Sequence, residues 1–401
     1  MTTENTLVVL FVIATAVALL AHRFRVPYTV ALVLAGIGIG TLGLIEPPHL
    51  TKSLLFAFIL PGLLFEAAFQ LDPALVRRNF RVITALAVPG VVVAISLTAA
   101  ICTLAFRVLG LDPGFSMTMG LVFGGLIAAT DPIAVVALFR SMHTSPRLTT
   151  VIEGESLLND GTSIVFLTLI LGYVAGTTTT PTAIAVQLVM MVGGGVLVGA
   201  AMGLGTSGVM KRIDDPMIEI TLAVIAAYGS FVVAEQLHCS GVLATVTAGM
   251  ICGDYGQQAA MSPASRTAVH AFWQYASFAL NSLVFLMVGF TVPLGSLLAS
   301  WPEIGIAYLA ALGGRAGVVA VVSFLFGRTA ERLPAGWPAV LTWGGLRGAL
   351  SVVLALGLAP DFPERALLEV MTLGVVVVSL TVQGLSMGWV LRRARLADGA
   401  S

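Results

Sequence analysis

Two carboxylate side chains stand inside stretches of sequence that are otherwise apolar enough to cross a lipid bilayer. Asp131 precedes a proline in LIAATDPIAVV, and Asp160 follows an asparagine in EGESLLNDG. An ionisable group at that depth costs free energy, so each is a candidate for function. One short polar loop separates the two stretches, which should therefore run antiparallel. At the helical rise the two acids lie about 12 and about 14 Å from that loop, so we expect them to meet at one depth.

The residues around Asp160 offer oxygen atoms on two neighbouring faces of one helix. Ser156 and Asp160 are four positions apart and share one face, whereas Glu155 and Asn159 share the adjoining face. The first face can hold a ligand, and the second can fix the structure around it.

A helix break in the other stretch adds further oxygen atoms. Pro132 has no amide hydrogen and disfavours helical geometry at Asp131, so Asp131 should cap a new half-helix whose first residue is Pro132. The carbonyl group of Thr130 should then be free to face a cation. Small hard cations prefer carboxylate, hydroxyl and carbonyl oxygens. The predicted cation ligands are therefore Asp160, Asp131, Ser156 and the Thr130 carbonyl.

Other charged residues are also embedded in apolar sequence. Glu66 in LPGLLFEAAFQ is a further candidate for ion or proton binding, or alternatively an interfacial residue beside Arg77. Arg315 and Arg347 lie within apolar spans and need partners. Glu155 is the expected counter-ion, and depth along the helices does not choose between the two arginines.

The composition is that of a polytopic membrane protein. The 401 residues are 58% hydrophobic and only 10% charged, against roughly 25% charged residues in a soluble domain. Apolar windows, compared with the length of about 20 residues that crosses a bilayer, predict thirteen spans, of which the ninth is short. These are residues 6–21, 28–45, 53–71, 82–106, 115–139, 151–175, 183–210, 218–237, 240–253, 270–291, 303–327, 337–358 and 366–391.

The basic residues predict the orientation of the spans. Most of the 20 Lys and Arg fall in alternate loops, whereas the other loops hold only Lys52, Arg107 and Arg365. Basic residues favour the cytoplasmic side. We therefore expect the N-terminus outside, the C-terminus in the cytoplasm, and a multi-pass protein of the inner (cytoplasmic) membrane. The excess of Arg over Lys is typical of a GC-rich bacterial genome.

The remaining polar residues suggest no further site. Three acidic residues at span ends should be solvated: Glu153, Glu219 and Glu235. The cysteines have no metal or redox spacing: Cys102, Cys239 and Cys252. No basic cluster suggests nucleic acid. We expect no cofactor and no enzymatic activity.

Two interrupted spans predict an inverted repeat within one transport unit of residues 1–401. The second interruption is at WGGLRG, residues 343–348. The broken fifth and twelfth spans cross in opposite directions, which indicates repeats at 1–175 and 218–391 joined by a linker helix at 183–210. Asp131 would offset half-helix N-termini and Arg347 would offset C-terminal ends. The alternative is a simple kink at Pro132 and close helix packing at the glycines.

Five segments, in order along the chain, resemble monovalent cation/proton antiporters of the NhaP/NHE type. They are LLFEAAF at 63–69, ATDPIAVVALF at 129–139, GESLLNDGTSIV at 154–165, GGRAGVV at 313–319 and GGLRGALSV at 344–352. The resemblance implies an all-α protein of thirteen helices, a homodimer, and a six-helix core that moves like an elevator against the dimerisation domain.

The resemblance also implies roles for individual residues. Asp160 would bind the ion and the proton, surrounded by Asp131, Ser156, Glu66 and the Thr130 carbonyl. Arg315 would pair with Glu155 and Asn159, and Arg347 would lie at the helix break.

These features together predict exchange of Na+, or Li+ or K+, for H+ by competition at Asp160. Because Asn159 is not a second acid, we expect one charge to move in each direction. A gated cation channel is one alternative, and an intramembrane aspartyl hydrolase using Asp131 and Asp160 is another. The sequence leaves the choice among Na+, Li+ and K+ open.

Overall fold

The structure is all-helical over the residues it describes. It is a computed structural model that describes residues 3–24, 26–43, 55–177, 180–254, 261–292 and 294–396. The start of the third predicted span, the end of the second, and Lys52 lie outside these ranges.

The helices follow the thirteen apolar windows in order, and each window contains helical residues. The elements are α1 (Thr3–Phe24), α2 (Tyr28–Thr41), η1 (Leu55–Ile59), α4 (Leu60–Gln70), α5 (Pro73–Arg78), α6 (Phe80–Ala87), α7 (Pro89–Leu109), α8 (Met117–Leu126), α9 (Ile133–Ser141), α10 (Pro146–Val174), α11 (Pro181–Met210), α12 (Pro216–Val224), η2 (Ile225–Gly229), α13 (Ser230–Gln236), α14 (Gly241–Ile251), α15 (Pro263–Phe290), α16 (Leu294–Ala299), α17 (Trp301–Phe326), α18 (Trp337–Trp343), α19 (Ala349–Leu356), α20 (Arg365–Val378), η4 (Ser379–Gln383) and α21 (Gly384–Arg393).

Seven helical stretches among the described residues are long and apolar enough to cross a bilayer, and five shorter apolar helices accompany them. The twelfth window is absent from both groups because its two halves, α18 and α19, are each too short. Helix length alone therefore does not establish the expected number of thirteen crossings.

The fifth and twelfth windows are interrupted where the sequence predicted. Helix α8 ends at Leu126 and α9 begins at Ile133, while α18 ends at Trp343 and α19 begins at Ala349. The first break differs from the prediction in one detail. Pro132 precedes the helix instead of being its first residue, and the Asp131 carboxylate accepts a hydrogen bond from the amide of Ile133 at 3.0 Å.

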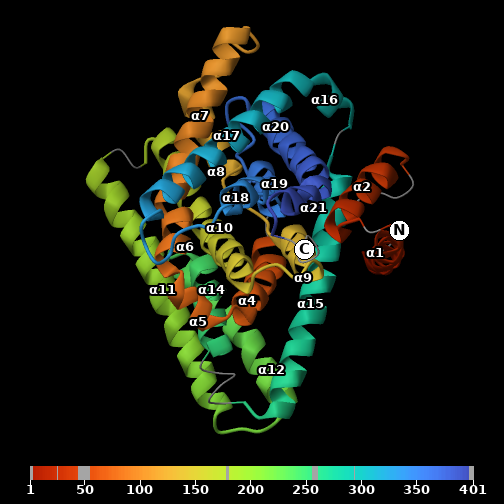
Figure 1. Ribbon diagram of the computed structural model, residues 1–401, viewed down its shortest axis with the longest axis vertical. Helices are drawn as coiled ribbons and strands as arrows, with labels where there is room; N and C mark the ends of the chain where they lie inside the picture. The colour runs from red at the N-terminus through yellow and green to blue at the C-terminus, as the bar shows by residue number, and fades with distance from the viewer. Residues whose placement is uncertain are drawn as a thin grey trace.

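Helix contacts divide the chain into two groups (Figure 1). Helices α6 to α10 pack with α17 to α21, whereas α1, α2 and α4 pack with α11 to α15. In Figure 1 the long helices α11 and α15 form the two edges of the lower half, with α12 between their lower ends. Helix α10 also contacts α4, α11 and α14, so it lies where the two groups meet. Each group draws helices from both halves of the chain, and the proposed inverted repeat remains a prediction.

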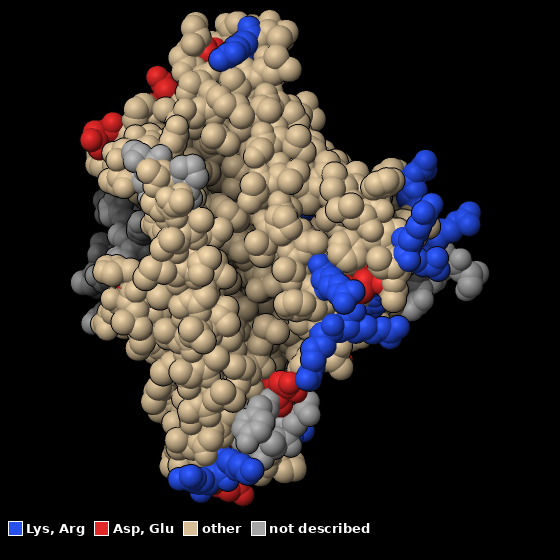
Figure 2. Space-filling model, turned by 90° about the vertical axis from the view of Figure 1, so that its left-hand side faces the viewer, with Lys and Arg blue, Asp and Glu red and all other residues tan. Residues whose placement is uncertain are grey.

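Charged side chains lie at the margins of the molecule (Figure 2). Most Lys and Arg side chains in this view are at the right and the bottom, with a few at the top. Acidic side chains are at the upper left and also beside the basic ones at the right and the bottom, and a broad uncharged surface lies between the upper and lower groups. Such a surface suits the hydrocarbon region of a bilayer. The direction of insertion remains a prediction.

The contact between α2 and α15 generates a stability prediction. A Cβ atom on Gly36 would overlap the backbone carbonyl oxygen of Leu286 and would lie 2.9 Å from Cα of Gly289. We expect Gly36→Ala to destabilise the protein by about 1–3 kcal/mol through overpacking, measured as a lower melting temperature in detergent. Gly38→Ala is the matched control, because a Cβ at Gly38 meets no atom within 4 Å. Equal melting temperatures for the two variants would contradict this account of the interface.

Candidate functional site

Helix α10 carries the central residues on two faces. Its 29 residues include Glu155, Ser156, Asn159 and Asp160. Ser156 and Asp160 line a cavity, whereas Glu155 and Asn159 are buried and contact neighbouring elements. The helical spacing thus separates a face that lines the cavity from a face that packs against neighbouring elements.

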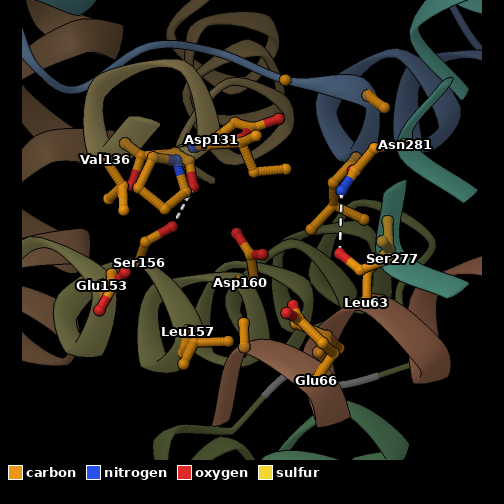
Figure 3. A pocket seen from close by; sticks show the side chains of 18 of the residues that line it. Leu63, Glu66, Asp131, Val136, Glu153, Ser156, Leu157, Asp160, Ser277 and Asn281 are labelled. Carbon is orange, nitrogen blue, oxygen red and sulfur yellow. Dashed lines mark hydrogen bonds between the residues drawn. The ribbon is translucent and has the colours of Figure 1, made fainter. Parts of the chain in front are cut away.

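The cavity has a volume of about 290 Å³. It lies between α4 and α15 on one side and α9, α10 and α19 on the other. Its polar lining comprises Glu66, Gln70, Thr130, Asp131, Arg140, Glu153, Ser156, Asp160, Ser277 and Asn281. The Arg140 side chain is 61% exposed, so the cavity reaches the protein surface at that end. Figure 3 shows Asp131, Ser156 and Asp160 facing the same space from two elements.

Asp160 stands in this cavity without a counter-ion. Within the described part of the chain its carboxylate has neither an ion-pair partner nor a hydrogen-bond donor. Asp131 differs, because its carboxylate is held by the backbone amide of Ile133. The site therefore contains one carboxylate fixed at a helix start and one that is available to a ligand.

Ser156 and Thr130 are already connected to each other. The Ser156 hydroxyl donates to the Thr130 carbonyl oxygen. The sequence predicted that the Thr130 carbonyl is free, whereas in the structure it accepts this hydrogen bond. A carbonyl oxygen nevertheless has a second lone pair. Because the Ser156 proton is directed to Thr130, the lone pairs of its hydroxyl oxygen remain available to a cation.

The two helix breaks cross and are joined by hydrogen bonds. The Asp131 amide donates to the Leu346 carbonyl oxygen at 2.8 Å. A Cβ on Gly348 would lie 2.5 Å from Asp131 Cβ, so only glycine allows this approach. The Asp131 side chain consequently lies near the starts of both α9 and α19, where negative charge is favourable.

Arg347 lies near the C-terminal end of the half-helix α8, whereas Asp131 lies near helix starts. Its guanidinium is buried and donates to the Ala128 carbonyl at 2.8 Å and to the Ala129 carbonyl at 3.4 Å. Its backbone amide donates to the Ser379 hydroxyl at 3.1 Å. These carbonyls follow the end of α8, so the positive charge stabilises a helix C-terminus.

Arg315 is the arginine that pairs with Glu155. Two guanidinium nitrogens contact the two carboxylate oxygens at 2.7 and 2.8 Å, and the side chains are 7% and 1% exposed. Arg315 also donates to the Leu341 carbonyl at 3.1 Å. This buried bidentate contact holds α17 against α10.

Asn159 extends this buried network to the first helix break. Its amide nitrogen lies 3.2 Å from Glu155 Oε1, from the Ala128 carbonyl and from the Thr130 hydroxyl. Its amide oxygen accepts from the Ser163 hydroxyl at 2.6 Å. Asn159 therefore positions the break and does not line the cavity.

The structure places Glu66 in the cavity wall, where Gln70 donates a hydrogen bond to its carboxyl group. Glu153 also lines the cavity and pairs with Arg140 at 3.2 Å. The expectation that Glu219 is solvated was wrong. Its side chain is fully buried, and its two carboxyl oxygens have no partner within the described residues.

Sequence reasoning missed Ser277 and Asn281 of α15, which line the same cavity as Asp160. An amide within an apolar span is a detectable signal, although the embedded acids are a stronger one. The cavity offers oxygen ligands without His or Cys, which suits a small hard cation. The ligand roles assigned from the sequence remain predictions.

Comparison with known proteins identifies extended similarity. The family model described as "Sodium/hydrogen exchanger, transmembrane" matches residues 8–393. The Na(+)/H(+) antiporter ApNhaP of Aphanothece halophytica is 34% identical over 401 residues, covering 98% of this chain and 75% of that protein. The Na(+)/H(+) antiporter NhaP of Pseudomonas aeruginosa is 37% identical over 351 residues, covering 85% of this chain and 81% of that protein.

The fold is also that of a solved structure. The sodium proton antiporter MjNhaP1 from Methanocaldococcus jannaschii superposes with a TM-score of 0.80, at 20% sequence identity, over 99% of this chain and 98% of that chain. The likeness confirms the all-helical membrane fold predicted from the sequence.

The buried pair generates a prediction about stability. We expect Arg315→Ala to lower the free energy of unfolding by on the order of 3–5 kcal/mol, because it leaves the Glu155 charge buried without a partner. The measurement is the melting temperature in detergent, with Arg365→Ala as control, since Arg365 forms a more exposed pair with Glu369. A double-mutant cycle should couple Glu155 to Arg315; stronger coupling of Glu155 to Arg347 would contradict the assignment.

Proposed function

The chain belongs to the sodium/hydrogen exchanger family, and we propose that it exchanges Na+ for H+ across the membrane with Asp160 as the shared binding group. Family membership confirms the resemblance seen in the sequence motifs. The relatives are named as antiporters, so the protein is a membrane transporter and not an enzyme. An intramembrane hydrolase is thereby set aside.

The observation that carries the proposal is the unpaired carboxylate of Asp160 in a cavity that reaches one surface. The other charges buried around the two helix breaks have partners that suit a structural role. Arg315 neutralises Glu155, Arg347 binds carbonyl groups, and Asp131 accepts a backbone amide. Asp160 is the acid whose charge a transported cation or proton can neutralise.

Neutralisation of the Asp160 carboxylate couples the movement of Na+ to the movement of H+. A bare carboxylate that leaves an aqueous cavity for the membrane interior loses hydration, which is costly. With either Na+ or H+ bound, the carboxylate is neutral and this cost is removed. A carrier that moves only when loaded must also return loaded, and net transport occurs when it carries Na+ in one direction and H+ in the other, so competition at Asp160 is sufficient for exchange.

In the proposed cation complex, Asp160, Asp131 and Ser156 supply oxygen ligands together with the second lone pair of the Thr130 carbonyl. Glu66 faces the complex from α4, at the side of the cavity that joins the surface. Glu155, Asn159, Arg315 and Arg347 hold the broken helices in place without contacting the ion.

The packing of the helices suggests which part moves. We assign α6 to α10 and α17 to α21 to a core that carries Asp160, and α1, α2, α4 and α11 to α15 to a frame in contact with it. An elevator-like displacement of the core would carry the site from one membrane face to the other. The frame would then form the interface of a homodimer.

The orientation in the membrane and the choice of cation are part of the same proposal. The N-terminus lies outside and the C-terminus in the cytoplasm, which places the opening of the cavity beside Arg140 on the cytoplasmic side. Na+ is the cation in the names of the relatives. Li+ and K+ are further candidate substrates, because the ligands offer oxygen atoms alone.

Substitution of the central acid tests the proposal directly. Asp160→Asn should insert and fold but lose exchange, because an amide can neither take up a proton nor neutralise a cation. Exchange is measured as fluorescence dequenching in inside-out vesicles upon addition of Na+. Glu235→Gln is the control, since Glu235 is exposed at the end of α13. Dequenching by Asp160→Asn at the rate of the control would disprove the assignment of the site.

The stoichiometry gives a second prediction. With Asn159 in place of a second acid, one positive charge should move each way, and the exchange rate should not depend on voltage. Proteoliposomes are clamped with K+ and valinomycin at about 0 and about −100 mV, where one net charge would be worth about 2.3 kcal/mol. Proteoliposomes of Asp160→Asn correct for leak. A clear rate difference would mean that another acid, such as Glu66, also carries protons.

A further inference from the structure

Asn281 places an unpartnered amide oxygen inside the membrane-spanning helix α15. The residue is 8% exposed, and its Oδ1 atom has no hydrogen-bond partner within the described part of the chain. Burial of a carbonyl oxygen without a donor is unfavourable. A position that keeps such an oxygen is therefore a candidate for binding a ligand that supplies positive charge.

The orientation of the amide follows from its neighbour on the same helix. Asn281 Nδ2 donates to the Ser277 hydroxyl oxygen at 3.2 Å, one helical turn away. This bond occupies the nitrogen side of the amide and leaves the oxygen side without a donor. Figure 3 shows the two side chains together at the edge of the pocket, beside the space that Asp160 enters.

The cavity relates this oxygen to the acids of the site. Asn281 and Ser277 line it from α15, Glu66 lines it from α4, and Asp131 and Asp160 line it from the opposite side. Four acidic residues, namely these three and Glu153, thus line the same cavity of about 290 Å³ as Asn281. A monovalent cation that enters it meets carboxylate oxygens from both sides and a neutral oxygen from α15.

We propose that Asn281 Oδ1 is a further neutral ligand of the transported cation, or of a water molecule in its hydration shell. The inference rests on the proposed exchange function and extends it to a residue outside the broken helices. Amide oxygens are suitable ligands for small hard cations. The ligand from α15 belongs to the frame, whereas Asp160 belongs to the core.

Because Asn281 belongs to the frame and Asp160 to the core, the two membrane faces should differ in cation affinity. If the core moves and α15 does not, Asn281 can contact the cation only while the cavity has its present position. Loss of the amide oxygen should therefore weaken cation binding from the face to which this cavity opens, and should leave release at the other face unchanged. Affinity would thus depend on the side of addition.

The test uses Asn281→Leu, which has a similar volume without an oxygen, and Asn281→Asp, which keeps an oxygen at the same position. Ser282→Ala is the control, because Ser282 bonds to Tyr28 at 2.7 Å instead of lining the cavity. Dequenching is recorded in inside-out vesicles as a function of Na+, Li+ and K+ concentration. In these vesicles the cations are added to the face that is cytoplasmic in the cell.

We expect Asn281→Leu to raise the half-maximal Na+ concentration about three- to tenfold, the range of one neutral hydrogen-bonding contact, with the maximal rate within about twofold of wild type. Asn281→Asp should restore the wild-type concentration dependence or shift it to lower Na+. Ser282→Ala should match wild type. In right-side-out vesicles, addition of Na+ to the opposite face should give equal half-maximal concentrations for Asn281→Leu and wild type.

Three results would overturn the inference. Unchanged cation dependence in Asn281→Leu would place the oxygen outside the ion's coordination, and equal impairment of Asn281→Leu and Asn281→Asp would indicate a packing role. An equal effect at both membrane faces would contradict its place in the frame. If Asn281→Leu does not insert, Asn281→Ala is measured by the same criteria. Absence of exchange by wild type would instead disprove the proposed function itself.

Discussion

The backbone groups freed by two broken membrane helices are the constraint on which the rest of the structure depends. Within a bilayer no water is available to satisfy them, so protein groups must. The Asp131 amide bonds to the Leu346 carbonyl, the Asp131 side chain accepts from Ile133, and the Arg347 guanidinium donates to Ala128. The crossing is stable because each type of helix end faces the charge that suits it.

The buried charges around this crossing are of two kinds: those that are held by hydrogen bonds and the carboxylate of Asp160, which is not. The pair of Glu155 and Arg315 is closed on itself by two hydrogen bonds, and Asn159 connects it to the first break. Such a pair fixes geometry more than it adds stability, because desolvation offsets much of its attraction. The result is a hydrogen-bonded wall behind Asp160, whose carboxylate alone among these groups has no partner in the described chain.

The motifs of α9, α10 and α19 predicted much of the site, because its acids and its helix breaks occur at positions where an apolar span would otherwise be uninterrupted. Depth along the helices could not choose between Arg315 and Arg347. Both are embedded at similar depth, and the choice depends on which face of α17 packs against α10. Which arginine pairs with Glu155 depends on how each helix is rotated about its axis and on which helices are in contact. The spacing of residues along the sequence does not specify either.

The sequence by itself determined the class of the protein, the positions of the two breaks and the two faces of α10, because hydropathy, proline geometry and helical period are local properties. The tertiary structure decided which groups meet. It showed that the Thr130 carbonyl accepts the Ser156 hydroxyl, that Glu219 is buried, and that Asn281 of α15 lines the cavity of Asp160. These contacts join segments more than a hundred residues apart or depend on packing between helices, and no local pattern encodes that.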